Sequence, residues 1–270
     1  MKFTPVSGGC INYCFHLETS AGNYFLKYND AASYPGMFKS EATGLQLLRD
    51  ANALPVPMVH FHSEAKGFSF LLLEWIDGGR REKNFWKNFG RAIAKLHKVG
   101  DESFGLNDDN YIGSLRQSNS KHTDWKTFFI RERIQPQFKL AHEKNLIDSE
   151  TMNQFEKLFD QFDKFIPQEK PSLLHGDLWN GNFLVNNSGK AALIDPAVYF
   201  GHREMDLAMT KLFGGFDPDF YNSYQEEYPL EKGFEKRIDI HNLYPLLVHV
   251  NLFGGGYLQQ VKSILNNLKM

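Results

Sequence analysis

The sequence predicts an α+β protein with two lobes, a small β-rich lobe over residues 1–76 and a larger, mainly helical lobe over 77–270. In the first part, apolar and polar residues alternate, which is typical of half-buried strands. In most of the second part, apolar residues recur at the three- and four-residue spacing of amphipathic helices. The change of pattern coincides with Asp77-Gly78-Gly79, which we interpret as a short hinge.

The first part is predicted to contain a hairpin, a helix and a further strand. Apolar and polar residues alternate over 11–17, turn residues occupy 20–23, and 24–28 has the composition of a return strand. A helix is expected over 40–48, because its apolar residues share one face. A strand is expected over 68–75, just before the hinge.

The second part is predicted to be helical with one β-hairpin. Apolar stripes at helical spacing are formed by Phe85, Phe89, Ile93 and Leu96, by Met152, Phe155, Phe159, Phe162 and Ile166, and by Leu258, Val261, Leu265 and Leu268. Pro167 follows the second stripe as a stop signal. Residues 182–186 and 190–195 flank the turn Asn187-Ser188-Gly189, which indicates a hairpin between the helices.

The composition narrows the class of ligand. The chain has 270 residues, with 30 Lys and Arg against 32 Asp and Glu, a net charge of −2. Non-specific binding of nucleic acid needs an excess of positive charge, so a generic polyanion binder is excluded. A small phosphorylated ligand needs only a few local donors and stays possible. The 24 phenylalanines predict an aromatic core and leave open whether some of them line a pocket.

No targeting or membrane-spanning segment is visible in the sequence. The first residues lack an apolar run of signal-peptide length, and no stretch approaches the ~18 apolar residues of a membrane helix. Cys10 and Cys14 alone cannot form a disulfide framework or a zinc site, so a reducing cytoplasm is the expected location. Cys10, beside two glycines, is either an exposed redox-active thiol or an unreactive buried one.

The strongest chemical pattern is the run His-Gly-Asp-Leu-Trp-Asn-Gly-Asn at 175–182. Phosphoryl transfer uses a carboxylate, here Asp177, to accept the proton of the attacking hydroxyl, and an amide oxygen, here Asn182, to bind Mg²⁺. The predicted hairpin returns Asp195 to the side of Asn182, which adds a second hard oxygen ligand. The alternative, that Asp177 and Asn182 merely cap turns, suits isolated residues better than the whole pattern.

A lysine within a predicted strand gives the second pattern. Lys27 has apolar neighbours on both sides, and Glu41 follows it at the start of the first predicted helix. In the kinase arrangement, a strand lysine pairs with a helix glutamate and holds the α- and β-phosphates of ATP. Alternatively, Lys27 is a solvated residue on the polar face of a strand.

Two further segments are assigned to nucleotide binding. Gly8 and Gly9 lie at a turn between β segments, where glycines let backbone N–H groups approach phosphate, although any tight hairpin also uses glycine. Glu74, Trp75 and Ile76 end the last strand before the hinge, and by position alone their backbone is expected to bind the adenine edge. Plain strand termination is the alternative for this second segment.

Two long runs resemble the fructosamine (ketosamine) kinase family, the run at 175–182 and Asp-Pro-Ala-Val-Tyr-Phe-Gly-His-Arg-Glu-Met-Asp-Leu-Ala-Met at 195–209. The likeness runs nearly from end to end, and further matches are found at 110–113, 212–216 and 251–257. His-Gly-Asp with the later Asn alone would indicate only the wider superfamily of aminoglycoside phosphotransferases and choline kinases.

The resemblance implies a bilobal protein-kinase-like fold that uses ATP and Mg²⁺ to phosphorylate the 3-hydroxyl of a ketosamine, either a ribulosamine, an erythrulosamine or a fructosamine. The phosphate destabilises the adduct, so the family is described as deglycating. Matched by motif, Asp177 resembles the proton acceptor, and Asn182 and Asp195 resemble the metal ligands. Lys27 and Glu41 resemble the pair that anchors the phosphates, and 74–76 resembles the adenine-binding segment.

Four residues near these motifs carry further expectations. Asp195 is followed by Pro196, which fixes φ and removes an N–H, so we expect a constitutively assembled site without switching of this segment. Asp206 either braces the catalytic loop, as the resemblance favours, or is a charge on a helix face. Trp179 either stacks on the sugar or packs as core. His175 is expected to hold the loop and not to act as the base.

Two alternatives for the function stay open at this point. The first is a kinase of another hydroxylated amine, of the aminoglycoside or choline type. The second is a catalytically inactive binding protein on a kinase scaffold, which the presence of Lys27, Asp177, Asn182 and Asp195 argues against. The sugar, the choice between protein-bound and free amines, and the oligomeric state are not predicted.

Overall fold

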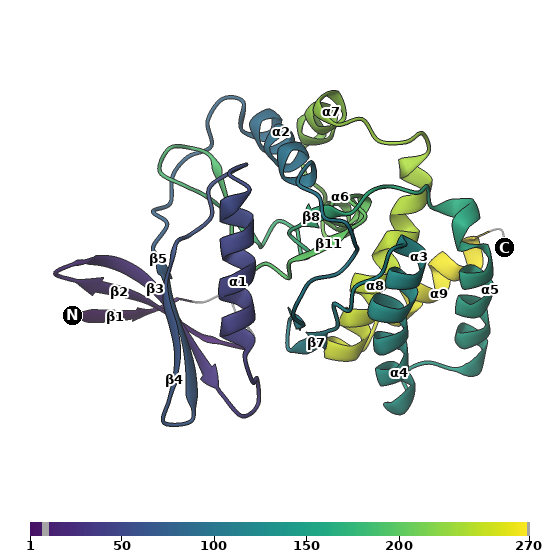
Figure 1. Cartoon of the computed structure of the whole chain (residues 1–270), viewed down its shortest axis with the longest axis horizontal. Helices are drawn as coiled ribbons and strands as arrows, with labels where there is room; N and C mark the ends of the chain where they lie inside the picture. The colour runs from purple at the N-terminus through teal and green to yellow at the C-terminus, as the bar shows by residue number, and fades with distance from the viewer. Residues whose placement is uncertain (7–10, 269–270) are drawn as a thin grey trace.

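The computed structural model describes residues 1–6 and 11–268 of the chain. A five-stranded antiparallel sheet forms one side of the molecule, and helices make up most of the other side (Figure 1). Helix α1 (Met37–Asp50) lies between the sheet and the helical part. This arrangement confirms the predicted α+β class, with the sheet first in sequence and most helices after it.

The sheet has the strand order β1-β2-β3-β5-β4. Its strands are β1 (Lys2–Pro5), β2 (Tyr13–Thr19), β3 (Gly22–Asp30), β4 (Val59–Ala65) and β5 (Phe68–Glu74). The predicted hairpin corresponds to β2 and β3, and the strand predicted before the hinge is β5. We did not predict β4, because nearly all its side chains are exposed and it lacks the alternation of a half-buried strand.

The register of the sheet decides where Lys27 points. Lys27 of β3 lies opposite Cys14 of β2 and Leu71 of β5. Leu71 is fully buried in the same apolar cluster as Leu45 of α1, so this face of the sheet is the one that α1 covers. Side chains two residues apart share a face, and Phe25 therefore points the same way as Lys27.

The helical part contains the three predicted helices and several others. Its helices are α2 (Phe85–His97), α3 (Trp125–Phe128), a π-helical segment η1 (Phe129–Ile134), α4 (Gln135–Glu143), α5 (Ser149–Phe165), α6 (Glu204–Leu212), α7 (Pro218–Glu227), α8 (Phe234–Phe253) and α9 (Tyr257–Asn267). The predicted apolar stripes coincide with α2, α5 and α9. Within residues 1–6 and 11–268, no helix has both the length and the apolar character needed to cross a bilayer.

Three short antiparallel strand pairs lie among the helices. They are β6 (Asn110–Ile112) with β7 (Leu115–Gln117), β8 (Ser172–Leu174) with β11 (Tyr199–Gly201), and β9 (Phe183–Val185) with β10 (Ala191–Leu193). The pair β9–β10 is the predicted hairpin. The β8–β11 pair brings together the two segments that flank the catalytic motifs, which are far apart in sequence.

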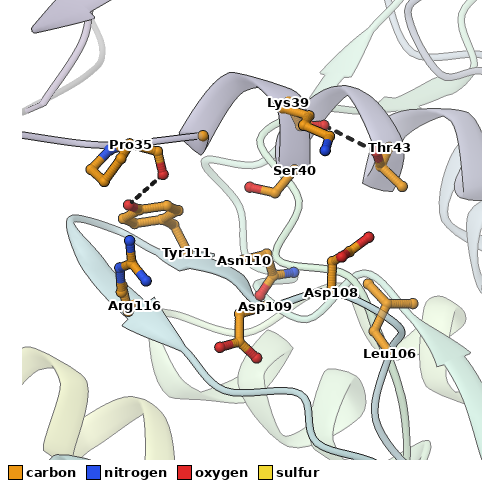
Figure 2. Close-up of a pocket in the computed structure, with 11 residues that line it drawn as sticks. Pro35, Lys39, Ser40, Thr43, Leu106, Asp108, Asp109, Asn110, Tyr111 and Arg116 are labelled. Atoms are coloured by element: carbon orange, nitrogen blue, oxygen red, sulfur yellow. Dashed lines mark hydrogen bonds between the residues drawn. The ribbon is translucent and has the colours of Figure 1, made fainter. Parts of the chain in front are cut away.

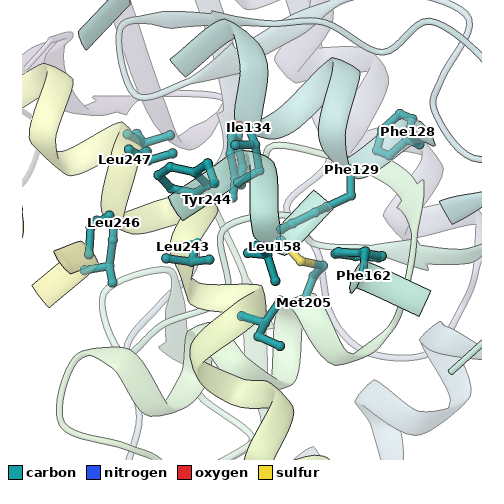
Figure 3. Packing of buried hydrophobic residues seen from close by; sticks show 14 of the residues in the cluster. Phe128, Phe129, Ile134, Leu158, Phe162, Met205, Leu243, Tyr244, Leu246 and Leu247 are labelled. Carbon is teal, nitrogen blue, oxygen red and sulfur yellow. The ribbon is translucent and has the colours of Figure 1, made fainter. Parts of the chain in front are cut away.

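The apolar core consists of two clusters. One lies within the helical part, where rings such as Phe128, Phe129 and Phe162 pack against Leu158 and Leu243 (Figure 3). The other cluster joins residues of the sheet and α1 to residues of α2, α7 and the β9–β10 hairpin. Because this second cluster includes residues on both sides of position 77, the core is continuous across the predicted hinge. The division at residue 77 stays a prediction.

Candidate active site

The loop between β8 and β9 places Asp177 and Asn182 side by side. The Nδ2 of Asn182 donates to Oδ2 of Asp177 at 2.7 Å and to its backbone oxygen at 2.8 Å. The backbone N–H of Ile194 donates to the backbone oxygen of Asn182 at 3.1 Å. The hairpin thus ends beside the loop, as predicted, with Asp195 as the residue that follows Ile194.

Lys27 joins the sheet to this loop. Its side chain is 4% exposed, and Nζ donates to Oε1 of Glu41 at 2.7 Å. The same Nζ donates to Oδ1 of Asp195. Lys27 of β3 is therefore in direct contact with Glu41 of α1 and with Asp195, which follows β10, and the alternative of a solvated Lys27 is wrong.

Lys27 and Asp177 differ in whether they have a neighbour of opposite charge. Burial lowers the pKa of Lys27, but the neighbouring carboxylates of Asp195 and Glu41 raise it by a larger amount. The net shift is upward, so the ammonium stays charged. Within residues 1–6 and 11–268, Asp177 has no such cationic partner. Burial raises the pKa of Asp177 to about 7, against the opposing effect of the hydrogen bond from Asn182. A carboxylate that exchanges its proton near neutrality is suited to act as a general base.

The atoms left free suit a divalent cation. Asn182 turns its Nδ2 toward Asp177, and Asp195 uses Oδ1 for Lys27. Among the described residues, this leaves Oδ1 of Asn182 and Oδ2 of Asp195 available to a cation. The side chain of Asp195 is 45% exposed. Carboxylate and amide oxygens are ligands that Mg²⁺ accepts, so these donors fit the predicted metal.

Asp206 of α6 holds the start of the loop at 175–182, which we call the catalytic loop. Its carboxylate accepts the backbone N–H of His175 at 2.7 Å and that of Gly176 at 2.9 Å. His97 of α2 lies against the same carboxylate at 3.2 Å and against the hydroxyl of Tyr224 at 2.9 Å. The bracing role predicted for Asp206 thus matches its contacts. We did not predict His97, although a polar residue in the apolar stripe of α2 was a usable signal.

His175 is a structural member of the loop. Burial lowers its pKa, so the ring is neutral. Nε2 donates to the backbone oxygen of Ile194 at 3.0 Å, and Nδ1 accepts the backbone N–H of Asp177 at 3.3 Å. Both ring nitrogens are engaged, as expected of a residue that holds the loop and is not the base.

A glycine lets the catalytic loop contact the segment after Asp195. Gly176 has φ of 82°, and a Cβ there would lie 2.0 Å from the backbone oxygen of Ala197. The N–H of Ala197 donates to the backbone oxygen of His175 at 2.9 Å. A residue with a side chain at position 176 would push the two backbones apart.

Side chains from distant elements hold the segment after Asp195 in place. Asn110 of β6 donates to the backbone oxygen of Val198 at 2.8 Å, and Gln117 of β7 donates to that of Ala197 at 3.2 Å. On the other side, a Cβ at Gly44 of α1 would lie 3.1 Å from the Val198 side chain. The segment is thus fixed by contacts on both sides, which agrees with an assembled site.

The structure describes only some of the residues that are predicted to bind the nucleotide. Glu74 ends β5, and the ring of Trp75 stacks on His16 of β2 with centroids 3.8 Å apart. A hollow of about 630 Å³ borders 74–77, but it is lined by the α1–β4 connection and by 186–187, not by Lys27. The adenine role of Glu74, Trp75 and Ile76 stays a prediction. Gly8, Gly9 and Cys10 lie outside the described residues.

A second hollow of about 200 Å³ lies between α1 and the β6–β7 hairpin (Figure 2). Lys39, Ser40 and Thr43 border it from α1, and Tyr111 closes one end, where its hydroxyl donates to the backbone oxygen of Pro35 at 3.1 Å. Neither hollow contains Asp177 among its lining residues.

Comparison with known proteins supports the resemblance. The family model "Fructosamine kinase" matches residues 1–270. A probable ketoamine kinase of Enterococcus faecium is 38% identical over 98% of this chain and 95% of its own. A chloroplastic protein-ribulosamine 3-kinase of Arabidopsis thaliana is 37% identical over 98% of this chain and 82% of its own.

Solved structures show the same fold. The crystal structure of a putative fructosamine-3-kinase from Haemophilus somnus is similar over 100% of this chain and 92% of its own, with a TM-score of 0.90 and 32% identity. An aminoglycoside phosphotransferase in a ternary complex with AMP-PNP and hygromycin B covers 98% of this chain and 93% of its own, at a TM-score of 0.59 and 16% identity, which supports the fold alone. With a family model matched over its whole length, the chain belongs to the fructosamine kinase family of phosphotransferases that act on an alcohol group.

Proposed function

We propose that this protein transfers the γ-phosphoryl group of ATP to the 3-hydroxyl of a ketosamine and thereby promotes deglycation. The observation that carries the proposal is the contact between Lys27, Glu41 and Asp195 beside the Asp177–Asn182 pair. These are the charged and amide groups that phosphoryl transfer from ATP requires. Membership of the kinase family supports the use of ATP.

In the proposed reaction, Asp177 accepts the proton of the sugar hydroxyl. The hydroxyl oxygen forms a bond to the γ-phosphorus while the bond from that phosphorus to the bridging oxygen of ADP breaks. Asn182 holds the carboxylate of Asp177 by its side-chain N–H at 2.7 Å, which orients the base toward the acceptor. Most of the acceleration comes from positioning and electrostatics, because little covalent chemistry falls to the protein.

The remaining predicted residues position the nucleotide. Lys27, kept charged by its two carboxylate neighbours, would bind the α- and β-phosphates. Asn182 and Asp195 would hold Mg²⁺, which neutralises charge on the β- and γ-phosphates when bound. In our proposal, backbone N–H groups at Gly8 and Gly9 contact the phosphates, and the backbone of 74–76 contacts the adenine.

Family membership supports ketosamines as the substrate class, and the identity of the sugar is a separate proposal. The Arabidopsis relative is named for ribulosamines bound to protein, which favours a ribulosamine. We therefore propose ribulosamine, erythrulosamine and fructosamine as the substrates to compare, in that order. A cytoplasmic location is proposed with it, although the Arabidopsis relative is named as chloroplastic.

The test is transfer of labelled phosphate from ATP to these three ketosamines, measured side by side with an aminoglycoside and choline. We expect turnover of at least one ketosamine in the presence of Mg²⁺, and none with Asp177→Asn under the same conditions. Turnover of an aminoglycoside or choline without any ketosamine would reverse the choice of substrate. Absence of both Mg²⁺-dependent ATP binding and turnover would favour an inactive binding protein.

A further inference from the structure

A fully buried arginine, Arg133, lies in the π-helical segment η1 of the helical part. Its guanidinium carbon lies 3.9 Å from the ring centroid of Tyr199, 4.5 Å from that of Phe128 and 5.5 Å from that of Tyr244. Phe128 and Tyr244 belong to the apolar cluster of Figure 3. In the part of the chain that the structure describes, no carboxylate pairs with this guanidinium. Burying a cation without a counter-ion is costly, so its charge depends on ring faces and hydrogen bonds.

The hydrogen bonds of Arg133 lead to two buried asparagines, Asn119 and Asn110, which we call the amide pair. Nη2 of Arg133 donates to Oδ1 of Asn119 at 2.7 Å. Nδ2 of Asn119 donates to Oδ1 of Asn110 at 3.0 Å, and Nδ2 of Asn110 donates to the backbone oxygen of Val198 at 2.8 Å. The guanidinium is thus connected, through two amides, to a backbone oxygen three residues after Asp195.

Arg133 decides which way the two amides face. An arginine has five N–H donors and no acceptor, whereas an amide side chain can turn either its oxygen or its nitrogen toward a neighbour. Only Oδ1 of Asn119 can face Arg133, which leaves Nδ2 to donate to Asn110. Oδ1 of Asn110 also accepts Nε2 of Gln117 at 2.8 Å, so Nδ2 of Asn110 faces Val198. A reversed amide would set donor against donor at the arginine.

The same guanidinium contacts the next residue of that segment directly. Tyr199 follows Val198 and starts β11, where it pairs with Leu174 of β8, the residue before His175. Arg133 lies over the ring of Tyr199. One cation therefore acts on two successive residues at the point where the segment after Asp195 meets the start of the catalytic loop.

We propose that Arg133 is a positioning residue, which holds residues 195–199 through the amide pair and the ring of Tyr199 and so keeps Asp195 in place. The inference rests on the proposed function, in which Asp195 binds Mg²⁺. Without the cation, the two amides are free to turn over, and the backbone oxygen of Val198 loses its donor. The segment then becomes more mobile, and Asp195 binds the metal less well.

Two variants interrupt this connection at different points. Asn119→Asp keeps an oxygen for Arg133 and gives its charge a counter-ion, but removes the N–H that Asn110 accepts. Arg133→Met removes the cation and keeps an unbranched side chain. The first readout is hydrogen exchange of the backbone N–H of Ala197, which donates to the backbone oxygen of His175 at 2.9 Å. We expect exchange about tenfold faster in both variants, the equivalent of one lost hydrogen bond.

The second readout is the affinity for AMP-PNP, measured by calorimetry with and without Mg²⁺. The gain in affinity that Mg²⁺ provides should fall about tenfold in both variants, whereas the affinity without Mg²⁺ should stay within about twofold. Asn251→Asp is the matched control, since this buried amide donates to the backbone oxygen and Oε1 of Gln137 on α4 at 2.8 and 2.9 Å. It should leave both readouts within about twofold of the unmodified protein.

Unchanged exchange of Ala197 in Asn119→Asp would overturn the role of Arg133. An equal increase in Asn251→Asp would also overturn it, because the loosening would then be general. If Arg133→Met does not fold, Asn119→Asp decides alone. If the unmodified protein shows no Mg²⁺-dependent binding of AMP-PNP, the proposed function is wrong, while hydrogen exchange still decides whether Arg133 holds the segment.

Discussion

Two carboxylates of this protein, the buried Glu204 and the half-buried Asp177, are held in opposite ways. Glu204, which is fully buried, receives Nε and Nη2 of Arg237 at 2.8 and 2.5 Å and faces Nε2 of His241 at 3.1 Å. Burial alone would raise its pKa, but the hydrogen bonds from Arg237 and His241 hold it at about 2. In the part of the chain that the structure describes, the side chain of Asp177 accepts a hydrogen bond from the amide of Asn182 alone, and burial raises its pKa to about 7. The structural carboxylate is neutralised by partners, whereas the proposed base is left ready to take a proton.

The same pairing engages a carboxylate that also belongs to a group of potential metal ligands. His202, Glu204 and His241 bring three ligating atoms within 4.8 Å of one another. Both oxygens of Glu204 are already bound to Arg237. Burial lowers the pKa of His202 to about 4, and its Nε2 donates to the backbone oxygen of Pro167 at 3.2 Å. The carboxylate of Glu204 and Nε2 of His202 are therefore already engaged within the protein.

The largest effect on activity is expected from replacing Asp177. Asp177→Asn removes the proton acceptor but keeps the shape of the side chain, so kcat should fall by at least about a hundredfold. The variant should be as stable as the unmodified protein or more so, because a partly desolvated carboxylate with a raised pKa is gone. Steady-state phosphorylation assays and urea unfolding measure the two effects. Activity near the original rate in a folded Asp177→Asn protein would remove Asp177 from the mechanism.

Breaking the paired carboxylate should affect stability instead. Glu204→Gln leaves Arg237 buried without its counter-ion, which should lower the free energy of unfolding by about 3–5 kcal/mol. Glu235 is the control, because it pairs with Lys211 at 3.0 Å and its side chain is 74% exposed. Glu235→Gln should cost about 0–1 kcal/mol. Equal losses for the two variants in urea unfolding would contradict the account of the buried pair.

A smaller effect on activity is expected beneath the loop. Asp206→Asn keeps one oxygen but loses the charge that accepts the N–H groups of His175 and Gly176. A charged hydrogen bond contributes about 1.5–3 kcal/mol, so we expect kcat to fall about tenfold with little change in KM for ATP. Asp217→Asn, at the exposed N-terminus of α7, is the control and should leave kcat unchanged. A change in KM alone would assign Asp206 to binding.

The pH dependence of stability should have opposite signs at the two carboxylates. The pKa of Asp177 is raised in the folded protein, so its contribution is complete below the unfolded value of 3.8 and is lost as the pH rises to about 7. The pKa of Glu204 is depressed, so its contribution is present above 4.5 and is lost as the pH falls toward 2. Urea unfolding from pH 3 to pH 8 should show Asp177→Asn gaining on the unmodified protein as the pH rises. If the difference in the free energy of unfolding between the two proteins is the same at every pH, the raised pKa of Asp177 is wrong.

The sequence was most informative where the chemistry is local. Asp177 and Asn182 lie in one loop, and a hairpin turn signal was sufficient to return Asp195 to their side. Lys27 and Glu41 belong to neighbouring elements of the first part, and the kinase arrangement of a strand lysine with a helix glutamate predicted their contact. In each case the residues that meet are close in sequence or are joined by a recognisable turn.

We did not predict the side chains that hold the site in place, because they are far in sequence from the residues they contact. Asn110 reaches the backbone of Val198 across 88 positions, and His97 reaches Asp206 across 109. Nothing in the local pattern of either residue indicates its partner. The stack of Trp75 on His16 was missed for a related reason, since it depends on the register of β2 with the rest of the sheet. Tertiary packing decides all of these contacts.

The central claim is that Asp177 acts as a general base whose pKa is raised by burial. The most direct measurement is kcat/KM for the ketosamine as a function of pH from 5 to 9, at saturating Mg²⁺ and ATP. We predict that kcat/KM rises tenfold per pH unit on the acid side and levels off with a midpoint well above 3.8, the ordinary pKa of an aspartate, because burial raises the pKa of Asp177. A profile that stays flat down to pH 5 would contradict the claim, because the proton acceptor would then be ionised well below neutrality.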